Sequence, residues 1–105
     1  MGEDAERLKQ RLPLLDYLRQ QNWQGSPAAG GAELAGLCPL HPESRPSFYV
    51  NPQRNVFYCH GCGQGGDLIR FIQISQHLSF RQTLAYLEQL LAPPQPATNL
   101  VKARN

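Results

Sequence analysis

Two pairs of metal-binding side chains constrain the fold of this 105-residue chain more than any other feature. Two residues separate Cys38 from His41 and Cys59 from Cys62, and seventeen residues lie between the pairs. A two-residue spacer lets the chain fold back so that both side chains of a pair point at one ion. Three thiolates and one imidazole suit the tetrahedral preference of Zn²⁺ and leave no open coordination position. The pattern therefore predicts one structural zinc ion held by these four residues.

Two other interpretations of the same residues stay open at this stage. The three cysteines could be buried free thiols beside an unrelated histidine, or His60 could replace His41 as the ligand. Because His60 directly follows Cys59, its side chain is expected on the opposite face of the strand end. Disulfides are not expected, because three is an odd number and the acidic N-terminus does not read as a secretion signal. No apolar run of membrane-spanning length occurs either.

The length and the charge of the chain limit the functions that it can have. One domain of this size has a marginal hydrophobic core, which a bound zinc ion would stabilise. Ten basic and eight acidic residues give a formal charge of +2, which is not the charge of a protein that coats duplex DNA. Any affinity for nucleic acid must therefore come from the local placement of side chains.

Periodicity and turn residues predict an α+β fold with a small antiparallel sheet flanked by helices. Helices are expected over residues 3–12 and from Pro13 to residue 21, and others follow Asp67 and Ser79, which are good N-caps. Strands are expected over 46–50 and 55–59, and a loop connects shorter extended pieces at 22–24 and 33–37. The last helix should pack on the sheet through its apolar face. That face comprises Phe80, Leu84, Leu87 and Leu91. We expect one domain over 1–92 and a proline-rich tail or interdomain linker over 93–105.

Strand alternation places Tyr49 and Tyr58 on one face of the expected hairpin, with Arg45 and Arg54 near its ends. Aromatic and basic side chains interleaved on a sheet are the components of a platform on which single-stranded nucleic acid stacks. The alternative is that both tyrosines are ordinary strand residues packed under the N-terminal helices.

Two stretches of the chain resemble the N-terminal zinc-binding domain of bacterial-type DNA primases. The first runs from residue 36 to 50 and contains Cys38-Pro39-Leu40-His41 and Pro46-Ser47-Phe48. The second runs from 57 to 71 and contains Cys59-His60-Gly61-Cys62 followed by glycines and Asp67. The resemblance extends over roughly residues 5–92. It implies a zinc ribbon that binds single-stranded template and helps to select the start of primer synthesis. The DNA contacts that it implies are Arg45, Tyr49, Arg54, Tyr58, His60 and Arg70.

The sequence departs from that family in two ways. The stretch from residue 25 to 33 has no basic residue, and no Asp-x-Asp cluster of the kind that a polymerising domain needs occurs in the chain. We therefore expect no enzymatic activity from this chain alone. We expect an accessory, DNA-binding module of a primase or a primase-like replication protein in the bacterial cytoplasm, associated with the nucleoid. Its expected partners are single-stranded DNA and a primase catalytic domain or a helicase. The alternative is a zinc-scaffolded protein-interaction module that does not bind DNA.

Overall fold

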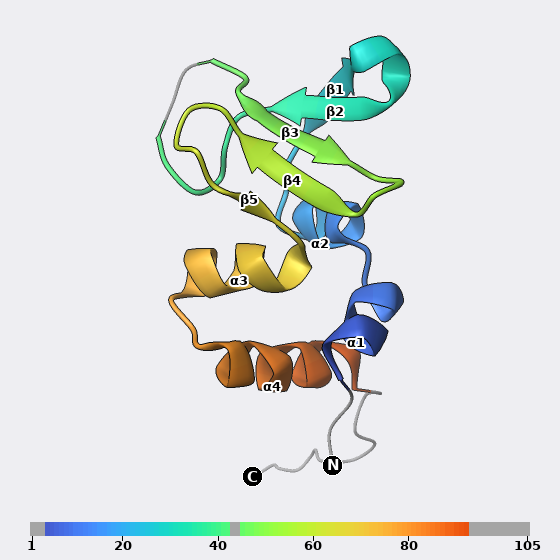
Figure 1. The fold of residues 1–105 in the computed structure, drawn as a ribbon, viewed down its shortest axis with the longest axis vertical. Helices are drawn as coiled ribbons and strands as arrows, with labels where there is room; N and C mark the ends of the chain where they lie inside the picture. Colours follow the sequence, from blue (N-terminus) through green and yellow to red (C-terminus); the bar gives the residue numbers. More distant parts are fainter. Residues whose placement is uncertain (1–3, 43–44, 93–105) are drawn as a thin grey trace, which may run out of the picture.

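A computed structural model describes residues 4–42 and 45–92 of the chain. It contains a sheet with helices on one side (Figure 1). The helices are α1 (Ala5–Arg11), α2 (Leu14–Gln20), α3 (Leu68–Gln76) and α4 (Phe80–Leu91), and the strands are β1 (Gly25–Ala28), β2 (Glu33–Gly36), β3 (Phe48–Asn51), β4 (Val56–Cys59) and β5 (Gly65–Gly66). Across the described ranges, no helix has both the length and the apolar character needed to span a membrane.

The helices begin at the residues that the sequence marks as caps. The Asp67 side chain accepts a hydrogen bond from the backbone N–H of Arg70, which starts α3. Ser79 and Gln82 form a reciprocal capping box at the start of α4. Pro13 separates α1 from α2, but it is the N-cap of α2 and not its first helical residue. The predicted starts of α2, α3 and α4 are thus confirmed to within a residue, whereas α1 starts at Ala5, two residues after the predicted start.

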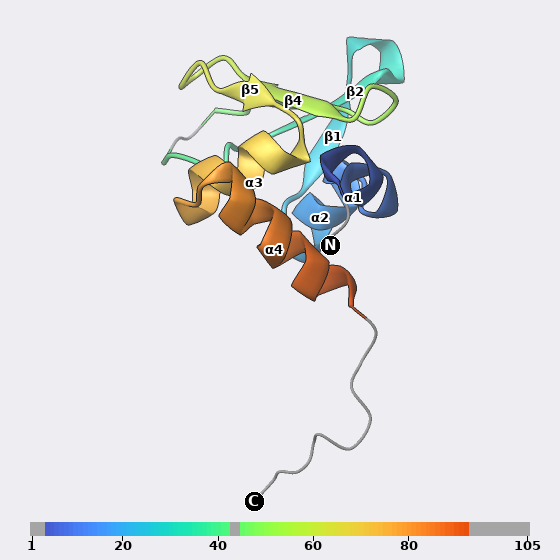
Figure 2. The ribbon, with the colours of Figure 1, turned by 60° about the horizontal axis from the view of Figure 1, so that its bottom comes forward.

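The sheet is antiparallel throughout, and its strands lie in the order in which they occur in the chain. Phe48, Val50 and Phe57 point to the inner face and are buried. Figure 2 shows that the helices lie beneath this face and leave the other face of the sheet open. The rings of Phe48 and Phe57 stack 5.3 Å apart, and Phe71 of α3 meets Phe57 edge-on at 5.4 Å. This aromatic core fixes which strand residues face solvent.

Two predictions about the sheet are wrong. The extended piece expected at residues 22–24 is not a strand; the strand is Gly25–Ala28, within the expected loop. The kinked segment after the second cysteine pair contributes the short strand β5. Both strands are rich in small residues with low strand propensity, and pairing with β2 and β4 outweighs that propensity.

The packing partner predicted for the last helix is also wrong. Helix α4 packs against α1 and α3, and α3 lies between it and the sheet (Figure 1). Leu87 is buried in this helical layer, whereas Phe80 remains 52% exposed. The periodicity correctly predicted an apolar face but could not identify its partner. The predicted tail or linker, 93–105, lies outside the described residues and stays a prediction.

Candidate metal centre

The first metal-binding pair follows β2 and is held in place by the only tryptophan of the chain. Trp23 is buried, and its indole N–H donates a 2.8 Å hydrogen bond to the carbonyl of Leu37, the residue before Cys38. The backbone N–H of Leu40 then points at the sulfur of Cys38, 3.3 Å away. The turn therefore aims a backbone dipole at the thiol that would bind the metal.

The second pair lies where β4 ends and the chain turns toward β5. The backbone N–H of Gly63 donates to the carbonyl of Cys59 at 2.8 Å, and Gly63 has a φ of 75°, which glycine adopts without strain. The N–H of Cys59 donates to the carbonyl of Gln64 at 2.8 Å. These two bonds close a tight turn that brings Cys59 and Cys62 to the same side.

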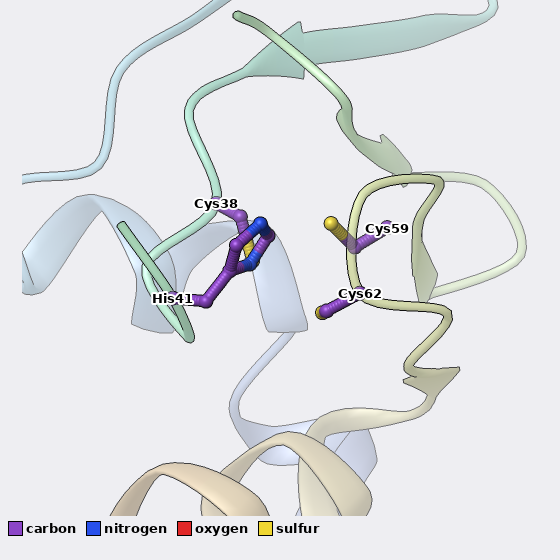
Figure 3. Close-up of side chains that lie close together, drawn as sticks. All are labelled: Cys38, His41, Cys59 and Cys62. Atoms are coloured by element: carbon purple, nitrogen blue, oxygen red, sulfur yellow. The ribbon is translucent and has the colours of Figure 1, made fainter. Parts of the chain in front are cut away.

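The two turns meet, and the four predicted ligands lie together (Figure 3). One donor atom from each of Cys38, His41, Cys59 and Cys62 lies within 4.8 Å of every other. Cys38 and Cys59 are buried, and His41 and Cys62 are partly buried. Three sulfurs and one imidazole nitrogen are the donor set of a closed tetrahedral zinc site, so the residues present fit this metal. A site with four protein ligands supplies scaffolding, because no position remains for substrate.

The two buried thiols differ in their electrostatic surroundings. Burial raises the pKa of Cys38 to about 12. Burial alone would also raise the pKa of Cys59, but hydrogen bonds from the N–H of Cys62, the Ser47 hydroxyl, the Cys38 thiol and the N–H of Gly61 lower it below the ordinary value. Zinc binds the thiolate form, so it must displace a proton from Cys38, whereas the turn already favours ionisation of Cys59.

Three aromatic side chains gather on the open face of the sheet beside this centre. Tyr49 and Tyr58 are directly paired across β3 and β4. The imidazole of His60 meets both phenol rings nearly perpendicularly, with centroid distances of 5.2 Å to Tyr49 and 4.9 Å to Tyr58. We call these three residues the aromatic cluster. His60 thus belongs to this face and is not among the four grouped metal-binding residues. Tyr49 and Tyr58 alternate with buried strand residues that face the helices, so the tyrosines lie on the opposite side of the sheet.

The three arginines that the sequence singled out stand apart from one another. Arg45 precedes β3, and Arg54 lies in the turn after it, so the two flank opposite ends of that strand. Arg70 is on α3, and its side-chain stem packs close to the backbone of Gly66. All three are exposed. The structure therefore brings the aromatic residues among the predicted DNA contacts together, whereas the three arginines lie around this cluster and apart from one another.

Sequence reasoning missed three residues that shape the site. Trp23 anchors the first turn, the Ser47 hydroxyl lies 3.7 Å from the sulfur of Cys59, and Gly65 lies under the ring of Tyr58. Their signals in the sequence are weak: a single tryptophan before the first cysteine, and a serine and a glycine within the two stretches that resemble primases.

The model of the CHC2 zinc finger family matches residues 3–98. The chain belongs to the CHC2 zinc finger family. The DNA primase of Streptomyces coelicolor is 38% identical over 89 residues, which are 81% of this chain and 13% of that protein. The DNA primase of Mycolicibacterium smegmatis is 49% identical over 59 residues, 56% of this chain and 9% of the relative.

This CHC2 zinc finger also has a solved structural counterpart in the Aquifex aeolicus primase structure that comprises zinc-binding and RNA polymerase domains. The match has a TM-score of 0.72 and 27% identity, and it covers 95% of this chain and 24% of that one. The predicted zinc-ribbon α+β fold is confirmed, and the family and the four-residue cluster together support one zinc ion per chain. The chain spans about a quarter or less of the length of these relatives.

Proposed function

We propose that this CHC2 zinc finger is the module with which a DNA primase binds single-stranded template. In this proposal Cys38, His41, Cys59 and Cys62 are the zinc ligands, and the aromatic cluster contacts DNA bases. The similarity to DNA primases supports the assignment to primer synthesis. The observation that carries the DNA-binding role is the aromatic cluster, because it lies on the face of the sheet opposite to the described helices α1 to α4.

The cluster has the features that stacking requires. The ring of Tyr58 is 47% exposed, so a base can reach it. His60 contacts both tyrosines, so the three rings are held as one unit and lose little conformational freedom when a base stacks on them. Each stacked base contributes about 1–3 kcal/mol, which is enough for binding without a strong positive field.

The charge around the cluster predicts weak dependence on salt. The nearest arginines of the hairpin are Arg45 and Arg54, one at each end of β3. For single-stranded nucleic acid, the logarithm of the association constant falls with the logarithm of the salt concentration, with a slope of about −0.7 per neutralised phosphate. One or two phosphate contacts therefore predict a slope of about −0.7 to −1.4, much shallower than for a basic groove.

A fluorescent single-stranded oligonucleotide, titrated with zinc-loaded protein across a salt series, tests the proposal. We expect Tyr58→Ala to weaken binding by about 1–3 kcal/mol, at least fivefold, at every salt concentration. Arg54→Ala should weaken binding less and should reduce the salt slope by about 0.7.

Two exposed residues on the far side of the molecule provide matched controls. Phe80→Ala removes an aromatic ring, and Arg81→Ala removes a charge, both from α4. Neither should change the affinity. Absence of binding at low salt, or equal effects of Tyr58→Ala and Phe80→Ala on the affinity, would contradict the stacking proposal.

A protein-interaction role is the second candidate, because the outer face of the β1–β2 hairpin is not basic. Ser26, Ala28 and Ala35 share that face with Glu33. Two measurements separate the candidates. If this face docks a protein, the oligonucleotide titration should show no binding, and Tyr58→Ala should weaken the association with a purified primase polymerase domain.

Within a whole primase, we propose an accessory role in the cytoplasm, with a primase catalytic domain or a helicase as a further partner. Residues 1–92 would be the template-binding domain, and 93–105 would lead to the catalytic part. The polymerising chemistry would belong to the partner domain, because the zinc site proposed here is closed. Mixing the purified module with a primase polymerase domain and measuring primer synthesis tests this step.

A further inference from the structure

Ser47 lies between the zinc turn and the aromatic cluster and contacts both. Its hydroxyl oxygen is 3.7 Å from the sulfur of Cys59, a hydrogen-bond distance for sulfur. Its backbone carbonyl accepts a 2.9 Å hydrogen bond from the N–H of His60. Ser47 is partly buried and directly precedes Phe48, which has no exposed surface. The core therefore fixes the position of the serine backbone beside Cys59.

The direction of the side-chain hydrogen bond follows from the chemistry of a metal-bound thiol. A cysteine bound to zinc has lost its proton, so its sulfur can only accept. The hydroxyl of Ser47 must then be the donor. The backbone N–H groups that approach the same sulfur come from the turn itself. The hydroxyl reaches it from the residue that precedes β3, and so links the start of that strand to the metal centre.

We propose that Ser47 is a positioning residue of the zinc site, whose hydroxyl orients the Cys59 thiolate and withdraws charge from it. This inference rests on the proposed ligand set. Groups that hydrogen-bond to metal ligands typically change metal affinity by about 10–100-fold. A neutral hydroxyl at this distance belongs at the lower end, so removing it should weaken zinc binding about tenfold.

The side chain and the backbone of Ser47 have separable roles. Ser47→Ala removes the hydroxyl and leaves the carbonyl that holds the N–H of His60. The aromatic cluster should therefore keep its arrangement when zinc is saturating, and oligonucleotide affinity should stay within about twofold of wild type. A residue that served the fold alone would not separate zinc affinity from DNA affinity in this way.

The test compares Ser47→Ala, Ser47→Thr and Ser47→Val, with zinc affinity measured by competition against a chromophoric chelator. Thr keeps a hydroxyl and Val has the same shape without one, so this pair decides the question even if the alanine variant folds poorly. Cobalt(II) substitution gives a second readout. Losing a hydrogen bond raises the energy of the sulfur lone pair, so the thiolate-to-cobalt absorption should move to lower energy in Ala and Val but not in Thr.

Ser75→Ala is the matched control, because the hydroxyl of Ser75 is buried on α3 and has no hydrogen-bond partner within residues 4–42 and 45–92. It should leave zinc affinity and the cobalt spectrum unchanged. Zinc affinity of Ser47→Val equal to that of Ser47→Thr, or a loss of affinity without a spectral shift, would overturn the proposal. The zinc content of Cys59→Ser tests the proposed ligand set separately. If that variant kept its zinc, the assignment of Cys59 as a ligand would be wrong, whatever the role of Ser47.

Discussion

At the scale of single residues, the absence of a side chain at Gly65 shapes the open face as much as the tyrosines do. Gly65 on β5 is paired with Tyr58 on β4. A Cβ at Gly65 would lie 2.8 Å from the ring of Tyr58 and 3.1 Å from the carbonyl oxygen of Phe57. Because no Cβ is present, the Tyr58 ring can lie over the backbone of the edge strand. The glycine thus determines how this ring is presented to a stacked base.

Gly65→Ala should therefore weaken oligonucleotide binding through Tyr58. The new methyl group displaces the ring, so we expect a several-fold loss of affinity with a destabilisation of about 1–3 kcal/mol, the usual cost of overpacking. The measurement is a double-mutant cycle with Tyr58→Ala, read by oligonucleotide titration. The effect of Gly65→Ala on affinity should vanish once Tyr58 is absent. An equal loss in both backgrounds would show that the glycine acts independently of the ring.

At the scale of elements, the sequence predicted the helices and the central hairpin but not the outer strands. Helix caps and alternating aromatic residues are local signals, and Ser79 and Phe57 carry them clearly. Strand β1 has no such signal: it consists of small residues, and its Gly25, like the paired Gly36 of β2, leaves room for the ring of Trp23, which a Cβ at either position would strike. Whether residues 25–28 form a strand depends on their pairing with β2. The grouping of the four metal-binding side chains could be predicted because the spacing within each pair is local, whereas the contact between Ser47 and Cys59 joins residues twelve positions apart.

The junction between α1 and α3 gives a prediction about a helix cap. Asp67 caps α3 and also accepts a 3.0 Å hydrogen bond from the ammonium of Lys9, which pairs with Glu6 as well. Asp67→Ala loses both interactions and should cost about 1–2 kcal/mol, whereas Asp67→Asn keeps the cap and should cost less than half as much. Urea unfolding of the zinc-loaded proteins measures the difference. Equal losses would mean that the ion pair, not the cap, is the stabilising interaction.

The contact between α2 and α4 predicts a loss of stability at alkaline pH. Burial, together with a 3.1 Å hydrogen bond to the hydroxyl of Tyr86, raises the pKa of Tyr17 above its ordinary value of 10.0. The unfolded chain then loses this proton first, so the contribution is complete below pH 10 and falls as the pH rises further. Each pH unit above 10 should cost up to about 1.4 kcal/mol. Urea unfolding between pH 9 and 11 should show a shallower decline for Tyr17→Phe; identical declines would contradict this origin.

At the scale of the whole molecule, one metal centre joins two turns whose ligand pairs lie seventeen residues apart in the sequence. Cys38 and His41 follow β2, Cys59 is the last residue of β4, and Cys62 lies in the turn after it, so a zinc ion bound by these residues would tie the end of β2 to the end of β4. Apparent binding free energies of structural zinc are about 10–16 kcal/mol, comparable with the entire stability of a small domain. The aromatic cluster includes His60, between two of these ligands. Metal binding should thus support both the fold and the proposed DNA-binding face.

Removal of zinc should therefore unfold the sheet and abolish oligonucleotide binding together. We expect a chelator, or Cys59→Ser, to eliminate the near-ultraviolet circular dichroism of the aromatic core and the cooperative thermal transition.

His60→Ala and His77→Ala are the matched controls, because neither histidine lies in the four-residue cluster. Both variants should keep one zinc per chain, measured by mass spectrometry under native conditions, and both should melt cooperatively. His60→Ala should nonetheless bind DNA less tightly, since its ring holds Tyr49 and Tyr58. A metal-free Cys59→Ser protein with a cooperative transition and intact aromatic dichroism would disprove the structural role of the zinc.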